Sequence, residues 1–585
     1  MKRKLGRPAA RPTRISRKET PARTPRWLRP VVVALSVLLL VALTSSEVGD
    51  PDTWQHLASG RYILQHHAFP TPDPFAFTTQ MVKPAYPDEE ATRRFNIKHE
   101  LLAQIVFYLA YTLADFAGLV LLRCTLLAAF CGFIGLAAGH RTHSFYRGFA
   151  AAAMAAIVTV PFQADRPYLF TFAFLAALIA ILEYRRWLWI LPVLFLVCAN
   201  SHGGFIMGWA VLVAYCGEAL FLRWRGQPPA DERRLWLVAA VSILISGCNA
   251  TGFQVVPVML AYRKSFTQTT LWDWQSPLLW PPGPVHILLT VAAVVLLWAR
   301  RRTRPVDWLL LGLFGTAALM ALRNTILAGL VAPLLIVTYL PWQEWVSPRL
   351  KYRLEYLTAL LALAATVVMV LQGRAFQFRA ADWKYPTGAA DFMLAHHITA
   401  PMFNTYESGA YLIWRLWPGE RVFIDGRAQS ETVYLDYKRI LHAVAVAPFH
   451  GTNAYQSLRP QRVGGRSAED LLRQYGVEVI LMGGFEYIGG GPYLLAAVLA
   501  DPDQTEWKLV YHDAQAMIFM RNPPVGVPPL PPLEALTSLE AQCAERISHE
   551  PASPRCAASL SYMFAGLGDR ERARRWHGIA AGHGI

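Results

Sequence analysis

Charged residues are scarce in this chain of 585 residues: only 16% are Asp, Glu, Lys or Arg, whereas 54% are hydrophobic. A soluble domain carries roughly a quarter charged residues, so this shortage argues against a soluble enzyme and favours a membrane protein. Cysteine is also sparse, and seven residues over such a length exclude a small disulfide-rich scaffold. Aromatic residues reach 12%, which excludes disorder over most of the chain.

Acidic residues are fewer than basic ones, and the formal net charge is +16. Eleven Lys or Arg residues lie within positions 1–29, with Glu19 as the single acid there, and the apolar run Pro30–Leu43 follows. Basic residues beside a first span keep that flank in the cytoplasm. Because no fold follows that could present the basic segment to a nucleic acid, we predict a cytoplasmic tail and no nucleic-acid partner. A cleaved signal peptide is the alternative, but Ala42–Thr44 makes a poor cleavage site.

Eleven apolar runs, the first at Pro30–Leu43 and the last at Leu357–Leu371, predict a polytopic α-helical membrane protein with about 11 spans. The loops between the runs alternate between arginine-rich and arginine-poor, as expected when the arginine-rich loops are cytoplasmic. The arginine-rich loops are Arg141–Arg147, Arg185–Arg186, Arg223–Arg234, Arg300–Arg304 and Arg349–Arg353. The N-terminus is therefore expected inside the cell and everything after Leu371 outside.

The predicted organisation starts with a basic tail (1–29) and a membrane body (30–372) that contains a large first external loop (45–113). An exported α/β domain (373–521), a Pro-rich linker (522–532) and a short helical tail (533–585) follow.

Within the exported region, runs rich in β-branched and aromatic residues predict strands, and stretches without Gly or Pro predict helices. The predicted strands are Arg421–Asp425, Val477–Leu481 and a hairpin within Trp507–Met520, and the predicted helices are Ala389–Ala395 and Ser467–Tyr475. Cys543 and Cys556 lie in the exported tail, where oxidation permits a disulfide between them.

The first external loop opens with apolar residues at helical spacing over Asp52–His66, which predicts an amphipathic helix lying in the interface. Pro70, Pro72 and Pro74 end that pattern, and a second helix is expected to begin near His99.

The strongest candidate for chemistry is Gly49-Asp50-Pro51-Asp52, just outside the first span. Two carboxylates at a membrane surface are costly unless they serve a purpose. In an extended segment both side chains project to the same side, where they could share a metal ion, or one could act as a base. The structural alternative is that Asp50 or Asp52 only caps the helix that follows.

With this acidic pair, an interfacial helix, a second helix before the next span and an exported C-terminal domain, the chain resembles the GT-C superfamily of membrane glycosyltransferases. The similarity is closest to the protein mannosyltransferase-like and aminoarabinose transferase-like branch. The matching stretches are Asp50–Ala58, Lys98–Leu102 and Leu121–Arg123, although His99-Glu100 stands where that branch usually has two prolines. A narrower resemblance is to a group of uncharacterised bacterial polytopic membrane proteins of similar layout. Its marks are Asp50–Leu57, Asp73-Pro-Phe, Asn200-Ser-His-Gly-Gly and Phe423–Arg427.

The resemblance implies a bacterial inner-membrane enzyme that moves a sugar from a polyprenyl-phosphate donor to an extracytoplasmic acceptor. A loop carboxylate, Asp52 with Asp50 as its partner, would deprotonate the acceptor hydroxyl, and cations would hold the leaving phosphate. The candidate cations are Arg166, Arg323 and Lys98. Each could instead be a helix-end residue, and Asp165 could simply pair with Arg166.

Two further residues complete the substrate-binding candidates. Glu100 belongs to the stretch that matches the family, and His202 lies between spans in Asn-Ser-His-Gly-Gly, whose glycines allow close approach of a ligand but also suit an ordinary tight turn. No zinc-type spacing of His and Cys is present, so any metal is expected to be Mg²⁺ or Mn²⁺ at Asp50 and Asp52.

Other classes of function remain as alternatives. A transporter or an assembly scaffold for cell-envelope components would need no base at the acidic pair, and a degenerate family member would bind a lipid-linked sugar without transferring it. The notable polar groups cluster at external span ends rather than at the membrane midplane, which favours an enzyme over a transporter.

Overall fold

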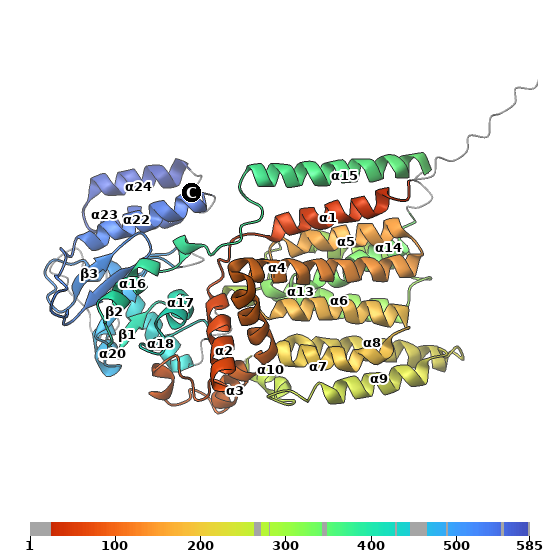
Figure 1. The fold of residues 1–585 in the computed structure, drawn as a ribbon, viewed down its shortest axis with the longest axis horizontal. Coiled ribbons are helices and arrows are strands. Elements are labelled where there is room, and N and C mark those ends of the chain that lie inside the picture. The colour runs from red at the N-terminus through yellow and green to blue at the C-terminus, as the bar shows by residue number, and fades with distance from the viewer. Residues whose placement is uncertain are drawn as a thin grey trace, which may run out of the picture.

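The structure is a computed structural model, which describes residues 25–262, 271–279, 281–341, 348–427, 430–444, 465–486, 490–551 and 555–582. Most of the predicted basic tail lies outside these ranges. A bundle of roughly parallel helices forms one half of the molecule and an α/β domain forms the other, with short helices between them (Figure 1).

Each apolar run predicted as a span forms a helix of the bundle. These helices are α1 (Leu28–Thr44), α4 (Leu101–Thr142), α5 (Phe145–Thr159), α6 (Tyr168–Tyr184), α7 (Leu191–Ser201), α8 (Ile206–Trp224), α9 (Glu232–Ile245), α12 (Pro284–Trp298), α13 (Pro305–Met320), α14 (Leu327–Tyr339) and α15 (Pro348–Leu371). By length and composition, three helical segments of the described chain could cross a membrane, Glu89–Thr142, Gly203–Trp224 and Arg353–Leu371, and the other apolar helices are shorter. The chain is therefore a membrane protein built on a helical bundle.

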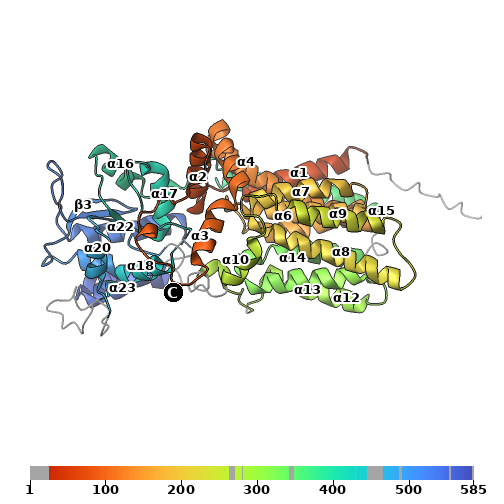
Figure 2. The same cartoon turned by 90° about the horizontal axis from the view of Figure 1, so that it is seen from below.

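Short elements link the bundle helices, and several of them occupy the junction with the α/β domain. They are α2 (Asp52–His66), η1 (Thr78–Gln80), α3 (Glu89–Lys98), η2 (Leu188–Ile190), η3 (Gly203–Phe205), α10 (Val255–Tyr262), η4 (Trp272–Trp274) and η5 (Leu322–Asn324). The helix predicted over Asp52–His66 is confirmed with the same bounds. The second helix of the loop is the start of α4, which breaks at Ala114 and Asp115, where Asp115 has a φ of 53°. The break lets the first part of α4 lie beside α2 across the end of the bundle, as the two views show (Figures 1 and 2).

The α/β domain contains one four-stranded sheet in the order β1-β2-β4-β3. Its elements are η7 (Asp382–Lys384), α16 (Thr387–Ala395), β1 (Met402–Asn404), α17 (Tyr406–Leu416), α18 (Glu431–Leu441), α20 (Ala468–Gln474), β2 (Val479–Met482), α21 (Leu494–Leu499), β3 (Lys508–His512), β4 (Met517–Met520), α22 (Glu534–His549), α23 (Arg555–Gly566) and α24 (Arg570–Gly582). β1 is parallel to β2 with Phe403 opposite Ile480, and β2 and β3 are each antiparallel to β4. Every residue of β2 and β4 is buried, as expected for central strands covered on both faces.

Most of the elements predicted for this domain are present. The strand at Val477–Leu481 and the hairpin within Trp507–Met520 appear as β2, β3 and β4, and the two predicted helices as α16 and α20. The strand predicted at Arg421–Asp425 is wrong: this segment makes an isolated parallel bridge from Val422 to Ala76 of the first loop and does not join the sheet.

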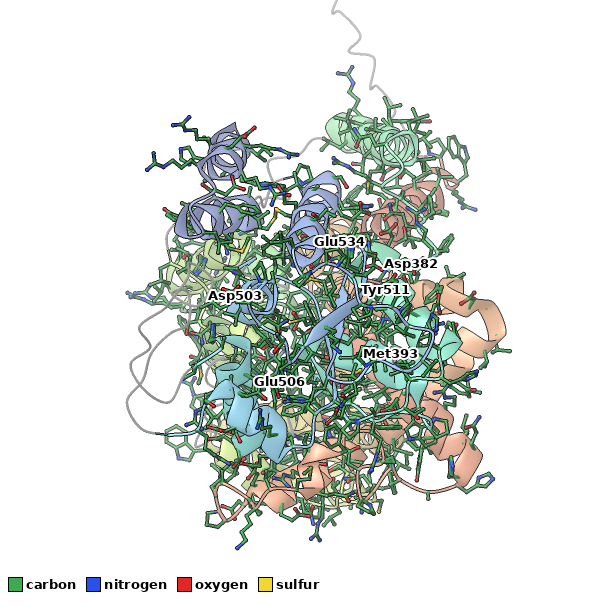
Figure 3. All side chains as sticks on the ribbon, turned by 90° about the vertical axis from the view of Figure 1, so that its left-hand side faces the viewer. Asp382, Met393, Asp503, Glu506, Tyr511 and Glu534 are labelled. Carbon is green, nitrogen blue, oxygen red and sulfur yellow. A yellow bond between two sulfur atoms is a disulfide. The ribbon has the colours of Figure 1, made fainter. Side chains whose placement is uncertain are left out.

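The three C-terminal helices share a core with the sheet. Leu539 of α22, Phe564 of α23 and Trp576 of α24 are buried in the same cluster as Phe519 of β4. The predicted disulfide is confirmed, since Cys543 of α22 is bonded to Cys556 of α23. Figure 3 looks onto this end of the molecule, where Glu534 at the start of α22 lies near Tyr511 of β3.

The first loop and the α/β domain are joined through a common core. Trp54 of α2 packs edge-on against Tyr385 and Tyr411 of the domain, with ring centroids 5.2 and 5.0 Å apart. The backbone of the loop also bonds to the domain, since Val48 pairs with Ala380 and Ala76 with Val422. The junction is therefore a packed interface and not a flexible linker, and it holds the domain over the acidic pair.

Candidate functional site

The acidic pair lies at the start of α2, where the local sequence sets its geometry. Pro51 has a φ of −57°, which suits the first turn of a helix. Oδ1 of Asp50 accepts a hydrogen bond of 2.9 Å from the backbone N–H of Asp52, so Asp50 does help to begin the helix, as the structural alternative held. Its other oxygen remains for a second partner.

Arg166 bridges the two carboxylates. Its Nε lies 2.9 Å from Oδ2 of Asp50, and its Nη1 lies 3.0 Å from Oδ2 of Asp52. The guanidinium therefore occupies the position between the carboxylates that the sequence analysis gave to a metal ion. Asp50 therefore both caps the start of α2 and pairs with Arg166. Asp50, Asp52 and Arg166, all singled out from the sequence, form one cluster.

Burial and the neighbouring charges shift the pKa of one carboxylate of the cluster, that of Asp52. Burial raises the pKa of Asp52 to about 7, although Arg166 acts to lower it, and the negative charge of Asp50 adds to the rise. Asp52 therefore has a proton affinity suited to a general base near neutral pH. Arg166 stays charged, because the two carboxylates raise its pKa well above its ordinary value.

Arg166 is held in place by a second buried pair. The alternative that Asp165 pairs with Arg166 is wrong, since Asp165 pairs with Arg123 of α4 at 3.0 Å, and both side chains are fully buried. Arg123 also donates to the backbone carbonyls of Thr44, at 3.1 Å, and Ser46, at the end of α1. The Arg123–Asp165 pair thus ties the loop that carries Arg166 to the segment that leads into Asp50.

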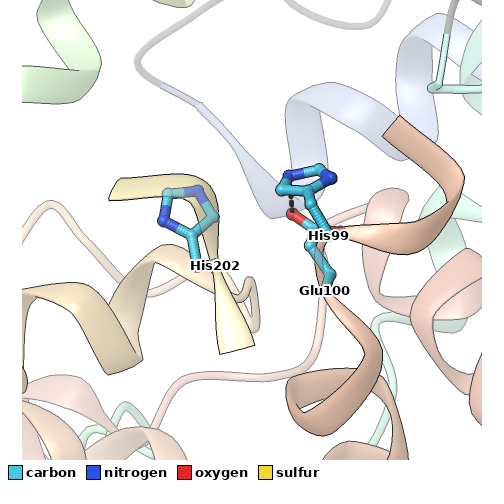
Figure 4. Close-up of side chains that lie close together, drawn as sticks. All are labelled: His99, Glu100 and His202. Atoms are coloured by element: carbon cyan, nitrogen blue, oxygen red, sulfur yellow. Dashed lines mark ion pairs between the residues drawn. The ribbon is translucent and has the colours of Figure 1, made fainter. Parts of the chain in front are cut away.

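A second cluster contains Glu100, His99 and His202 (Figure 4). One ligand atom from each of the three lies within 4.8 Å of the others, and Nε2 of His99 is 3.3 Å from a Glu100 oxygen. Nδ1 of His99 lies 2.9 Å from the carbonyl of Phe95, an outer contact that orients the ring toward Glu100. Burial lowers the pKa of His202 to about 3, so this ring stays neutral, the form that binds metals. Two imidazoles and a carboxylate could hold a transition-metal ion.

Arg323 and Lys98, the other two cations predicted to hold the phosphate, differ in how near they lie to the two clusters. Arg323 pairs with Asp273 at 3.7 Å and lies over the ring of Trp274 at 4.8 Å, and its positive charge helps to lower the pKa of His202. Lys98 lies 5.5 Å above the ring of Phe69. Arg323 therefore belongs to the surroundings of the clusters, whereas no described contact brings Lys98 to the acidic pair.

The α/β domain covers the acidic pair with the segment 424–427. A Cβ atom on Gly426 would overlap Oδ1 of Asp52, so any other residue here would force the Asp52 carboxylate to move. Arg427 fixes the segment by pairing with Asp73 of the first loop at 3.1 Å and with Asp425 at 2.7 Å. All three charged side chains are buried, which makes this a firm tie between the domain and the loop.

The contacts that Gly426 and Arg427 make with the first loop were not predicted from the sequence. More than 350 residues separate Gly426 from Asp52, and no periodicity or spacing reports a contact of that kind. His56 lies four residues after Asp52, on the same helix face, and its Nδ1 is 3.6 Å from Glu100.

No protein-family model and no curated protein matches the sequence. Among solved structures, the apo oligosaccharyltransferase of Archaeoglobus fulgidus covers 86% of this chain and 75% of its own, at 11% identity and a TM-score of 0.52. ArnT from Cupriavidus metallidurans in the apo state covers 85% of this chain and 98% of its own, at 14% identity and a TM-score of 0.45. The same protein bound to undecaprenyl phosphate covers 86% and 99%, at 14% identity and a TM-score of 0.38. The chain therefore shares its fold with this oligosaccharyltransferase, and the resemblance read from the sequence is confirmed at the level of fold.

Proposed function

We propose that this protein is a glycosyltransferase that moves a sugar from a polyprenyl-phosphate donor to an acceptor outside the cytoplasm. The observation that carries the proposal is the partly buried pair of carboxylates bridged by Arg166 where the helical bundle meets the α/β domain. The GT-C fold supports it, since the neighbour with the same fold is an oligosaccharyltransferase.

In the proposed reaction Asp52 is the general base. Its carboxylate takes the proton of the acceptor hydroxyl while the hydroxyl oxygen forms a bond to the anomeric carbon. The bond from that carbon to the phosphate oxygen breaks with inversion, and polyprenyl phosphate leaves with the bonding electrons. Arg166 positions Asp52 and Asp50, and Arg166 and Arg323 offer positive charge to the leaving phosphate. Glu100, His202 and Lys98 remain proposed contacts of the substrate.

The proposed orientation has about 11 spans in a bacterial inner membrane, with the N-terminus in the cytoplasm and the α/β domain outside. The end of the bundle away from that domain, where α4 meets α5 (Figure 1), carries the arginine-rich turn Arg141–Arg147. Cytoplasmic loops carry such an excess of arginine, which supports this orientation. It sets the acidic pair at the outer face, where a lipid-linked donor and an extracytoplasmic acceptor can meet.

We propose that the divalent cation, expected from the sequence at the acidic pair, binds instead at His99, Glu100 and His202. Imidazole ligands favour a transition metal such as zinc over magnesium. A bound cation supplies positive charge for a phosphate group. Purified wild-type protein is expected to retain metal in elemental analysis, and His99→Ala and His202→Ala are each expected to lose most of it. His66→Ala is the control, because that ring stacks on Tyr62 outside the cluster. Equal metal in all four proteins would overturn this assignment.

The test of the proposed function uses membranes that contain either the wild-type chain or an Asp50→Asn/Asp52→Asn double variant. Both are supplied with the host's lipid-linked sugar pool and an acceptor-containing envelope extract, and free polyprenyl phosphate is followed by mass spectrometry. Release by the wild type alone supports the proposal. Equal release from both would remove the carboxylates from the reaction, and no release from either would favour a transporter or scaffold.

The rate of release is expected to fall as pH drops through about 7, because Asp52 must be ionised to accept a proton and its pKa lies near that value. Asp50→Asn removes a neighbouring negative charge that raises this pKa, so the acid limb of the profile should move to lower pH. The measurement is the initial rate from pH 5.5 to 9 for both proteins. A limb that stays in place, or moves upward, would contradict the assignment of Asp52 as base.

A further inference from the structure

A small internal cavity lies between α2, the start of α4 and the α/β domain. Its lining is mostly polar and includes Gln55, Asn96, Glu100, Gln104 and Arg427. Gln55 follows Asp52 by three residues on α2, so both side chains lie on the same side of the helix. The cavity is therefore adjacent to the acidic pair.

Two buried amide groups in this cavity lack partners for their oxygens. Gln55 and Gln104 are only 9% and 4% exposed. Oε1 of each is buried, and neither has a hydrogen-bond partner among the described residues. Leaving a buried acceptor unpaired costs roughly 1–3 kcal/mol, so both oxygens require a donor, and the cavity, with room of about 10 Å³, admits a group the size of one water molecule or one hydroxyl.

Gly426 lies against both Asp52, the proposed base, and Gln55 of the cavity lining. The space that a Cβ of Gly426 would take is occupied by Oδ1 of Asp52, and Oε1 of Gln55 lies 3.4 Å from that position. The carbonyl of Gly426 accepts a 2.8 Å hydrogen bond from the hydroxyl of Tyr406, which fixes this backbone. The α/β domain thus forms the wall against which Asp52 and Gln55 are gathered.

The cavity lining offers both acceptors and donors of hydrogen bonds. Gln55 and Gln104 each have an unpaired amide oxygen, and the side-chain amides of Gln55, Asn96 and Gln104 also carry N–H groups. The guanidinium of Arg427 is already paired with Asp73 and Asp425. A hydroxyl group can donate to an amide oxygen and accept from an amide N–H, so its chemistry suits this lining.

We propose that Gln55 and Gln104 form a subsite that binds one hydroxyl group of the acceptor, with Gly426 as its wall, and that this contact orients the acceptor so that its reacting hydroxyl meets Asp52. The proposal rests on the proposed function and names the chemistry of its acceptor, a polyhydroxyl group such as a glycan or a sugar-bearing lipid. Gln55 and Gln104 are positioning residues in this scheme, and Asp52 remains the base.

The test titrates the envelope extract against membranes loaded with the lipid-linked sugar pool and measures release of polyprenyl phosphate. Gln55→Leu and Gln104→Leu are each expected to raise the half-saturating amount of extract about tenfold, the effect of one lost hydrogen bond, with a maximal rate within about twofold. Gln55→Asn keeps an uncharged amide and should lie between the wild type and Gln55→Leu. Gln474→Leu, on an exposed face of α20, is the matched control and should behave as wild type.

A second pair of variants tests the wall. Gly426→Ala places a methyl group on Oδ1 of Asp52 and should reduce release at least about tenfold, whereas Gly419→Ala meets no atom closer than 3.4 Å and should have no effect. Folding of both is checked by thermal unfolding. Release by the wild type with unchanged half-saturation in both leucine variants would overturn the subsite and leave the proposed function intact. No release by the wild type would overturn the proposed function and the subsite together.

Discussion

Asp52→Asn is expected to reduce release of polyprenyl phosphate by a factor of about 10²–10⁴, the range that a general base contributes. Asparagine has nearly the same shape and keeps an oxygen toward Nη1 of Arg166, which lies 3.0 Å from the carboxylate. It cannot take a proton from a hydroxyl, so the chemical step should fail while the surroundings are retained. The initial rate in the extract assay measures the effect.

The matched control is Asp88→Asn, an exposed carboxylate in the same loop at the start of α3. Its rate should equal that of the wild type. Asp50→Asn should fall between the two, because Asp50 contacts Arg166 and the N–H of Asp52 and is not placed as the base. An Asp52→Asn protein with a near-normal rate would rule out this residue as the base, and a deeper loss in Asp50→Asn would exchange the two roles.

Arg123→Met is expected to lower the free energy of unfolding by about 3–5 kcal/mol, because it leaves the buried carboxylate of Asp165 without its cation. The same change removes the bonds that Arg123 makes to the end of α1. Thermal unfolding of the detergent-solubilised protein measures the loss.

The Arg123→Met/Asp165→Leu double variant should recover part of this stability, since no uncompensated charge remains. Arg379→Met is the control: Arg379 also pairs with a carboxylate, that of Glu47, but its side chain is 71% exposed, and the loss should stay below about 1 kcal/mol. Equal losses for Arg123→Met and Arg379→Met would show that the buried pair does not carry the stability of this junction.

Local pattern was sufficient for the apolar helices of the bundle, for α2 and for part of the sheet. A helix such as α2 forms where residues 52–66 repeat at helical spacing between Pro51 and the prolines after Phe69, so its bounds follow from neighbours in the chain. β2 and the β3–β4 hairpin follow from short runs of strand-forming residues. β1 has only three residues, too few for any alternation to show, and it was not predicted.

The segment 421–425 shows why the same reasoning fails elsewhere. Its composition suits a strand, but whether it joins a sheet depends on which backbone lies beside it, and here that backbone belongs to the first loop. Edge pairing between distant segments leaves no trace in either segment alone.

The sequence by itself determined that the chain is a membrane protein built of apolar helices, and it singled out Asp50, Asp52 and Arg166, because composition, periodicity and rare charges beside apolar runs are local properties. Only the tertiary structure decided that Arg166 bridges the two carboxylates while Asp165 turns to Arg123. It also decided that Gly426 closes on Asp52. The packing of the bundle against the α/β domain decides which charged residues pair and which backbone approaches a distant side chain. No single stretch of residues encodes that packing.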